Sequence, residues 1–319
     1  MNQFLSSCDA AALADAAVKL MGGNMVAFPT ETVYGLGADA CNKEAVARIY
    51  STKGRPADHP LIVHVASMDA LDEWAEEVAE YAISLARDFW PGPMTLVVRR
   101  SGLAGDFVTG GQDTVGLRVP SHPVALALLE AFTQIGGRGI AAPSANRFGN
   151  VSPTTAQAVL QELGSFFADD DVILDGGGCD VGVESTIIDC TRDLPRILRP
   201  GGITEEMIEQ STALEVSDSA GPQIRVSGSL ESHYSPRAAV LLDQVPLAGQ
   251  GFIAMADVAS GQGVIRLAEP RTHEEFARVL YAALRAADEK GLSTVVVHQP
   301  LGTGIAIAIR DRLMRAAKK

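Results

Sequence analysis

Residues 28–37 read FPTETVYGLG and continue an apolar run, NMVAF (24–28), that we expect to form a buried strand. Beyond this strand the chain supplies hydroxyl and carboxylate side chains, a tyrosine and two glycines. Hydroxyl groups and bare backbone at the end of a strand suit a ligand-binding site. The stretch matches none of the standard nucleotide-binding motifs. Other segments of the chain therefore have to indicate which ligand it holds.

The composition restricts the class of protein. A chain of 319 residues with 47% hydrophobic and 20% charged residues is typical of a globular protein and long enough for two domains. A formal net charge of −13 argues against binding nucleic acid over a broad surface, although a local basic groove stays open. No lysine occurs between Lys53 and Lys290. An anion held by the middle of the chain must therefore be bound by arginine, hydroxyl groups or backbone N–H groups.

Cysteine spacing and hydropathy point to an intracellular protein. Cys8, Cys41, Cys179 and Cys190 lack the paired spacing of a zinc site or a redox motif, so we expect reduced, buried thiols. The N-terminus lacks a basic segment followed by an apolar one, and no run of about 18 apolar residues occurs. We therefore expect a cytoplasmic protein with no export signal and no membrane contact.

Short apolar runs alternate with helical patterns along the first two thirds of the chain. This predicts an α/β fold with a mixed sheet, because several connections are too short for helical crossovers. Asp9 is placed to cap a first helix that Gly22 and Gly23 would end. Helical patterns also cover residues 68–90 and 154–163. The further expected strands cover residues 61–65, 94–98, 114–119, 139–143, 172–175, 185–189 and 196–198.

The composition changes after the segment GGITEEMIEQ. Residues 211–236 are rich in Ser, Gly and Pro and poor in large apolar groups, which is typical of a linker. Residues 237–319 return to an α/β pattern, in which Thr272 and Glu275 form a capping box. We therefore predict a catalytic domain over residues 1–210, a linker, and a smaller Rossmann-like domain of three or more strands without G-x-G-x-x-G.

Two cations, Lys53 and Arg55, flank a glycine before a proline-stiffened loop, so we expect them on exposed backbone rather than on a helix face. The pair suits a polyphosphate, because arginine binds two oxygens at once and lysine adds a point charge. The alternative is a solvated basic loop. His64 alternates within LIVHV and points either into a cleft or into a core where it is satisfied.

Short polar side chains gather after another expected strand. Ser144 and Asn146 follow this strand, and Ser152 precedes Pro153 near a helix start. Hydroxyl and amide groups beside free N–H groups can form an anion or ribose pocket. Turn and capping chemistry alone would also explain Ser152 and Thr154.

Arg118 and Arg199 lie inside apolar runs with no acidic neighbour as an obvious partner. Because buried arginine is costly unless paired, each either contacts a carboxylate or phosphate or forms a salt bridge to a distant acid. A run of three glycines leads to Ser185 and Thr186 and would let the backbone approach a ligand, but the lysine of a P-loop is missing. No Ser/His/Asp or metal-binding spacing is visible. The pattern favours a site that positions an anionic, nucleotide-sized ligand over covalent catalysis.

The same segments, in the same order, resemble the YrdC-like domain family. The shared blocks are FPTETVYGLGADA, KGRP, HPLIVH, WPGPMTLV, LRVP, APSAN, GVESTIID and ILRPG. The later HYSP and the second α/β domain are similar to the two-domain form of the L-threonylcarbamoyladenylate synthase family. The resemblance is dense over residues 15–205 and looser beyond them.

This resemblance implies an open, twisted sheet with a deep concave site and a nucleotidyltransferase reaction. L-threonine, bicarbonate and ATP, with Mg²⁺, would give threonylcarbamoyl-AMP and pyrophosphate. The threonine carbamate would attack the α-phosphorus in line, so neutralising the polyphosphate would matter more than proton transfer. The product would serve a tRNA threonylcarbamoyl transferase complex that modifies position 37, and the enzyme itself would make at most a weak tRNA contact.

The resemblance also implies roles for individual residues. Lys53 and Arg55, as catalytic residues, and Ser144 and Asn146 match a K-x-R and S-x-N nucleotide motif. The implied threonine contacts are Thr32, His64, Arg118, Ala142 through its backbone, and Ser185. The other implied ATP contacts are His59, Thr114, Ser152, Arg199, His233 and Tyr234. The last two belong to the linker, which would close over the nucleotide. No protein ligand for a metal is implied.

Two departures from the family pattern and two rival functions accompany this interpretation. His59 stands where Asn is usual, and SGSLES replaces the basic residues that often precede HYSP.

One rival is a double-stranded RNA-binding module, which the net charge disfavours. The other is an enzyme that builds carbamoyl-adenylate for metallocentre maturation. That larger protein resembles a fusion with zinc-finger modules, and this chain has no paired cysteines to build one.

Overall fold

A computed structural model describes residues 3–6, 9–217, 224–228 and 233–318. The described chain before the linker folds around a ten-stranded sheet in the order β1-β8-β2-β3-β7-β4-β6-β5-β9-β10. The sheet contains both parallel pairs, such as β4·β6, and antiparallel pairs, such as β5·β6, so the predicted mixed sheet is confirmed. The strands are β1 (Gln3–Ser6), β2 (Val26–Phe28), β3 (Gly35–Asp39), β4 (Ile62–His64), β5 (Met94–Arg99), β6 (Thr114–Arg118), β7 (Ile140–Ala141), β8 (Val172–Asp175), β9 (Thr186–Asp189) and β10 (Arg196–Arg199).

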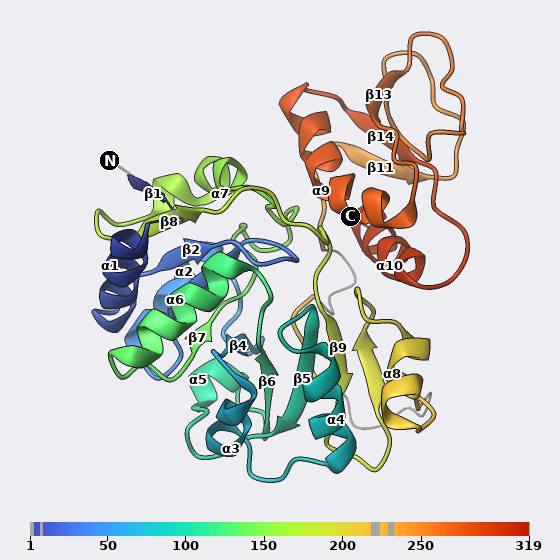
Figure 1. Ribbon diagram of the computed structural model, residues 1–319. Coiled ribbons are helices and arrows are strands. Elements are labelled where there is room, and N and C mark those ends of the chain that lie inside the picture. Colours follow the sequence, from blue (N-terminus) through green and yellow to red (C-terminus); the bar gives the residue numbers. More distant parts are fainter. Residues whose placement is uncertain (1–2, 7–8, 218–223, 229–232, 319) are drawn as a thin grey trace.

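Helices cover this sheet on both faces (Figure 1). Successive residues of β7 show the two sides, because Ile140 belongs to the core under α1 and α6 and Ala141 to the core that includes residues of α2, α4 and α7. Asp9 caps α1 as predicted, by accepting a hydrogen bond from Ala11 N at 2.8 Å. The helices are α1 (Ala10–Met21), α2 (Lys43–Lys53), α3 (Leu71–Trp74), α4 (Glu80–Phe89), α5 (Asp106–Thr109), α6 (Pro123–Gln134), α7 (Ala156–Leu163) and α8 (Glu205–Thr212), with 3₁₀ turns η1 (Met68–Ala70) and η2 (Gly164–Phe166).

The C-terminal residues form a separate four-stranded sheet in the order β11-β14-β12-β13, with every pair parallel. Thr272 caps α9 as predicted, although the side chain of Glu275 accepts from Arg271 N rather than from Thr272 N. Figure 1 shows α9 and α10 on the side of this sheet that faces the larger domain. A parallel sheet with helices confirms the smaller Rossmann-like fold. The elements are β11 (Ala239–Leu242), β12 (Gly251–Ile253), β13 (Ile265–Ala268), α9 (His273–Glu289), β14 (Thr294–Val297) and α10 (Ile305–Ala317).

The core of the C-terminal domain continues into the larger domain. Val33, Val151 and Val183 pack in the same apolar cluster as Phe276 and Leu280 of α9. The two domains therefore share an apolar contact beside the FPTETVYGLG segment.

Some expectations do not hold. Of the cysteines, Cys179 and Cys190 are buried, Cys41 is exposed, and Cys8 lies outside the described residues. The region 68–90, expected as helical, is broken between α3 and α4, where Ala75 bridges Arg100. In the described part of the chain, no helix combines the length and apolar character needed to cross a membrane.

Candidate functional site

The FPTETVYGLG segment forms two antiparallel strands, β2 and β3, joined by a polar loop. Thr30 organises the loop, because its hydroxyl donates to Val33 O at 2.6 Å and accepts from Val33 N at 3.2 Å. Gly37 is required by packing, since a Cβ there would lie 2.7 Å from Ile140 and 2.8 Å from Phe28. The loop is thereby fixed at the end of β2, where Thr32 is fully buried.

The five predicted threonine contacts lie together around one cavity: Thr32, His64, Arg118, Ala142 and Ser185. Arg118, at the end of β6, donates to Thr32 Oγ1 at 2.9 Å. Its guanidinium also lies 2.7 Å from the Glu31 carboxylate, and both side chains are buried. Of the two alternatives for Arg118, the structure thus shows the salt bridge to a distant acid, on the wall of the cavity.

His64 is a neutral group in this wall. Burial, with a smaller contribution from Arg118, lowers the pKa of His64 to about 3. The ring edge packs on Phe28 with centroids 5.9 Å apart, and Nδ1 has no hydrogen-bond partner. A buried imidazole with an unused nitrogen is suited to hydrogen bonding with a ligand rather than to holding charge.

Two further arginines and Ser144 line the other side of the cavity. Arg199 donates to Ser185 O through Nε at 3.1 Å and to Ser227 O at 2.8 Å. Arg55 donates to Pro60 O at 2.9 Å and to Ser227 Oγ at 3.2 Å. Burial lowers the pKa of Arg55 to about 10, and burial also lowers the pKa of Arg199. The cavity thus gathers cationic groups in an otherwise acidic protein.

Lys53, unlike Arg55 of the same K-x-R motif, is not part of the cavity wall. The expectation of exposed backbone away from a helix is wrong, because Lys53 is the last residue of α2 and both cations are buried. Lys53 Nζ donates to the carbonyls of Ser144, at 2.6 Å, and of Asn146, and it does not line the cavity. Burial, followed by the charge of Arg55, lowers the pKa of Lys53 well below its usual value. In this state the lysine fastens the APSAN loop to α2.

Four other predicted ATP contacts lie just outside the cavity wall. Asn146 donates to the carbonyls of Arg147 and Asn150 and leaves its buried Oδ1 unpaired. The hydroxyl of Ser152 donates to Glu184 Oε1 at 2.7 Å. His59 is half-buried and packs edge-on against Phe148. Thr114 lines a separate, mostly apolar pocket together with the buried Val226. Their roles as ATP contacts stay predictions.

Linker residues cover the cavity. Ser227, Gly228, His233 and Tyr234 all line it, and the open space that remains is about 40 Å³. This volume holds a few water molecules but no nucleotide. Entry of a nucleotide-sized ligand would require residues 224–228 and 233–234 to move.

Unpaired buried polar atoms concentrate at this cavity. They include Arg55 Nε, His64 Nδ1, His233 Nδ1 and the Tyr234 hydroxyl. Because buried polar groups are normally paired, such a cluster indicates that a polar ligand or water completes the hydrogen bonding.

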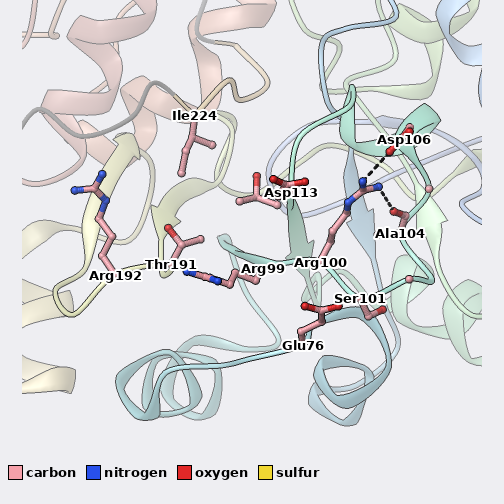
Figure 2. A pocket seen from close by; sticks show the side chains of 13 residues that line it. Glu76, Arg99, Arg100, Ser101, Ala104, Asp106, Asp113, Thr191, Arg192 and Ile224 are labelled. Atoms are coloured by element: carbon pink, nitrogen blue, oxygen red, sulfur yellow. Dashed lines mark hydrogen bonds and ion pairs between the residues drawn. The ribbon is translucent and has the colours of Figure 1, made fainter.

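A wider hollow of about 1060 Å³ lies at the opposite end of β5, around Arg99 (Figure 2). Its charges are mixed: Arg100 pairs with Asp106 at 2.7 Å and donates to Ala104 O at 2.8 Å. Of the predicted site residues only Thr114 borders it. The smaller cavity is therefore the candidate site.

Comparison with known proteins agrees with this geometry. A family profile described as telomere recombination (Sua5/YciO/YrdC) matches residues 19–201, and one described as threonylcarbamoyl-AMP synthase, C-terminal domain, matches residues 203–318. The threonylcarbamoyl-AMP synthase of Pyrococcus abyssi is 40% identical over 92% of this chain and 91% of its own length. The chain belongs to the threonylcarbamoyl-AMP synthase family.

A second relative and a solved structure extend the match. The Bacillus subtilis protein is 39% identical over 96% of this chain and 92% of its own. The crystal structure of P. abyssi Sua5 complexed with L-threonine has a TM-score of 0.86 and 37% identity, covering 97% of this chain and 95% of that one. The likeness therefore spans both domains.

The side chains at the site offer little to a metal ion. Within the described ranges, no group of three or more His, Cys, Asp or Glu side chains is arranged to hold one. Glu184, the carboxylate in the cavity wall, already accepts hydrogen bonds from Ser152, Tyr281 and Arg312. These residues do not fit a metal ion bound by the protein itself.

Two buried acids at the site, Glu31 and Glu184, were not predicted. Both stand in segments that were examined for hydroxyl groups, ETVYG and GVESTIID. A signal was present: neither carboxylate has a Lys or Arg in its own segment, and Arg118 has no acidic residue in its segment. Buried charges of opposite sign and without local partners must find each other in the fold.

Proposed function

We propose that this protein is an L-threonylcarbamoyladenylate synthase, which converts L-threonine, bicarbonate and ATP to threonylcarbamoyl-AMP and pyrophosphate. The observation that carries this proposal is the single buried cavity. It brings Arg118, Thr32 and His64 together with Arg55 and Arg199. Relatives that match both domains bear the name of this synthase, and one was solved with L-threonine.

Arg118 would hold the threonine carboxylate, with Thr32 and the neutral His64 beside it. A carboxylate bound there shares the guanidinium with Glu31, which keeps Arg118 oriented when the pocket is empty. The amine is left free to attack carbon dioxide derived from bicarbonate, and it loses a proton as the carbamate forms. Placing the two reactants together supplies much of the rate enhancement.

The carbamate oxygen would then attack the α-phosphorus of ATP, and the bond to the pyrophosphate oxygen breaks. Arg55 and Arg199 would neutralise the charge that develops on the phosphates, because both guanidinium groups are preorganised at the cavity wall. Mg²⁺ would arrive bound to the phosphates of ATP, as part of the substrate. The closed linker would keep water from the labile carbamate and acyl-adenylate.

We assign the reaction to the cytoplasm and to the first step of tRNA modification, since its acyl-adenylate product must be consumed by a transferase that acts on tRNA. The double-stranded RNA-binding alternative is not favoured. The cavity arginines are buried and engaged with backbone carbonyls, whereas RNA binding needs exposed cations along a surface.

The test is to incubate the protein with ATP, bicarbonate and each amino acid in turn. Pyrophosphate release and the mass of the adenylate are measured. We expect both products with threonine and at most traces with amino acids that lack its hydroxyl or methyl group. Absence of threonine-dependent pyrophosphate release from a folded sample would refute the proposed function.

A further inference from the structure

The Glu184 carboxylate is the meeting point of the two domains at the site. It accepts from Ser152 Oγ at 2.7 Å, from the Tyr281 hydroxyl at 2.7 Å and from Arg312 Nε at 2.8 Å. Ser152 belongs to the larger domain, whereas Tyr281 and Arg312 lie on α9 and α10 of the smaller one. Burial alone would raise the pKa of Glu184, but the Arg312 guanidinium holds it at about 2. Glu184 is therefore a fully charged, fully paired group next to Ser185.

Arg312 crosses the domain interface to reach three parts of the site. Its side chain is 1% exposed, and besides Glu184 it donates to Pro200 O at 2.9 Å, directly after Arg199. Its guanidinium also lies 5.4 Å from the ring centroid of Tyr234. A buried arginine is costly unless its hydrogen bonds are complete, and here the catalytic domain completes them.

Tyr234 needs support from outside the linker. Its backbone φ of +60° lies in the left-handed region, which is an outlier for a bulky side chain. Its ring stacks on Tyr281, with centroids 5.7 Å apart and planes inclined by 25°. Surrounding contacts must hold such a conformation, and Tyr281 and Arg312 provide them. The hydroxyl of Tyr234 is left unpaired at the cavity.

The close approach of α9 to the larger domain makes this arrangement specific. Gly182 adopts a φ of +79°, and a Cβ on it would lie 2.4 Å from Arg278 Cα and 2.5 Å from Ala277 O. Only glycine fits between the backbone of α9 and the loop that leads to Glu184. Because α9 packs this closely on Gly182, the Tyr281 hydroxyl lies within hydrogen-bond distance of Glu184, which follows Gly182 by two residues.

We propose that Tyr281 and Arg312 of the C-terminal domain are positioning residues of the active site. They fix Glu184, and through it Ser152 and Ser185, and they hold Tyr234 over the cavity. The small domain thus takes part in assembling the nucleotide end of the site rather than serving only to anchor the linker. This inference rests on the proposed synthase activity.

The test compares Tyr281→Phe and Arg312→Met with two matched controls, Tyr81→Phe and Arg310→Met. Tyr81, like Tyr281, donates a hydrogen bond through its hydroxyl, but its acceptor is the backbone carbonyl of Arg192 within the larger domain. Arg310 lies on the same helix as Arg312 but donates to Pro300 O within its own domain. Tyr281→Phe keeps the ring and so keeps the protein testable should Arg312→Met fail to fold. For each variant we would measure thermal unfolding, kcat and the KM for ATP, and calorimetric binding of a non-hydrolysable ATP analogue.

We expect Tyr281→Phe to lower kcat/KM for ATP about tenfold and Arg312→Met by more, because each leaves a buried carboxylate with unmet hydrogen bonds. Analogue binding should weaken in parallel, whereas the controls should stay within twofold of the parent. In a double-mutant cycle, Glu184→Gln combined with Arg312→Met should lose less than the sum of the two losses. A purely structural role would lower the melting temperature and leave kcat/KM of the folded variants unchanged.

Activity of folded Tyr281→Phe and Arg312→Met equal to that of the controls would overturn the inference. A parent protein that releases no pyrophosphate with threonine would instead overturn the proposed function. Analogue binding still tests the positioning role in that case: binding unaffected by Tyr281→Phe and Arg312→Met counts against it, and binding weakened by both supports it.

Discussion

Arg118 and Glu31 form a buried ion pair of 2.7 Å on the wall of the cavity, with side chains only 4% and 6% exposed. Glu31 is fixed in turn, because its other oxygen accepts from Ser121 N at 3.1 Å. In the proposed amino acid pocket, Arg118 is therefore held in place without a bound ligand. Substitutions at Arg118 and Glu31 can therefore distinguish the contribution of this ion pair to stability from the contribution of Arg118 to threonine binding.

Arg118→Met should abolish threonine binding and lower the free energy of unfolding by about 3–5 kcal/mol, because Glu31 is left as an uncompensated buried charge. The double variant Glu31→Gln with Arg118→Met should recover most of that stability without recovering threonine binding. Denaturant unfolding measures the predicted change in stability, and calorimetry with threonine measures the predicted loss of binding. Recovery of threonine binding in the double variant would show that Arg118 does not hold the carboxylate.

Arg55→Met should lower threonine-dependent pyrophosphate release at least about 100-fold, because one preorganised phosphate contact is lost. We expect the free energy of unfolding to change by no more than about 1 kcal/mol, since the lost hydrogen bonds are offset by relief from burying a cation. Steady-state kinetics and denaturant unfolding are the measurements. Arg138→Met, at an exposed arginine paired with Glu73, serves as the control and should behave like the parent. A fully active Arg55→Met would remove Arg55 from the site.

Ser227→Ala should tighten ATP binding about threefold to tenfold. The Ser227 hydroxyl accepts from Arg55 and donates to Pro60 O, so ATP must displace the linker from the cation that it needs. Removing a hydrogen bond to a charged group lowers the cost of that displacement. The dissociation constant of an ATP analogue measures this effect. Weaker binding in the variant would mean that Ser227 contacts ATP directly.

Acid should destabilise the protein between pH 6.5 and about pH 4.5, before most carboxylates titrate. Burial lowers the pKa of both His64 and His233 to about 3, whereas the unfolded chain has histidines near 6.5. In that range the unfolded state binds more protons, so each histidine lowers the free energy of unfolding by about 1.4 kcal/mol per pH unit as pH falls. Below about pH 4.5 the lowered pKa of Glu184 adds a further loss.

This pH dependence is measured as the denaturation midpoint at a series of pH values for the parent and for His64→Gln. We expect the variant to lose the part of the slope that His64 contributes, about 1.4 kcal/mol per pH unit. A parent whose stability is flat from pH 7 to pH 4.5 would contradict the neutral, buried state of these two rings.

Local patterns predicted those elements whose causes are local. Asp9 and Gly22 delimited α1, and short apolar runs located β4, β5 and β6. The strand β3 was not predicted, because GLGAD lacks the β-branched residues that mark a strand. The helix α2 was also not predicted, although its apolar residues Ala45, Val46 and Ile49 follow helical spacing.

The sequence by itself determined the α/β class, the two-domain order and the hydroxyl, arginine and glycine groups that make up the site. Only the tertiary structure decided which charges meet. Glu31 is 87 positions from Arg118, and Glu184 is 128 from Arg312, yet each pair lies within 2.8 Å. Helix caps and apolar periods arise from neighbours along the chain, whereas a buried charge is stabilised by whichever partner the packed sheets and helices bring to it.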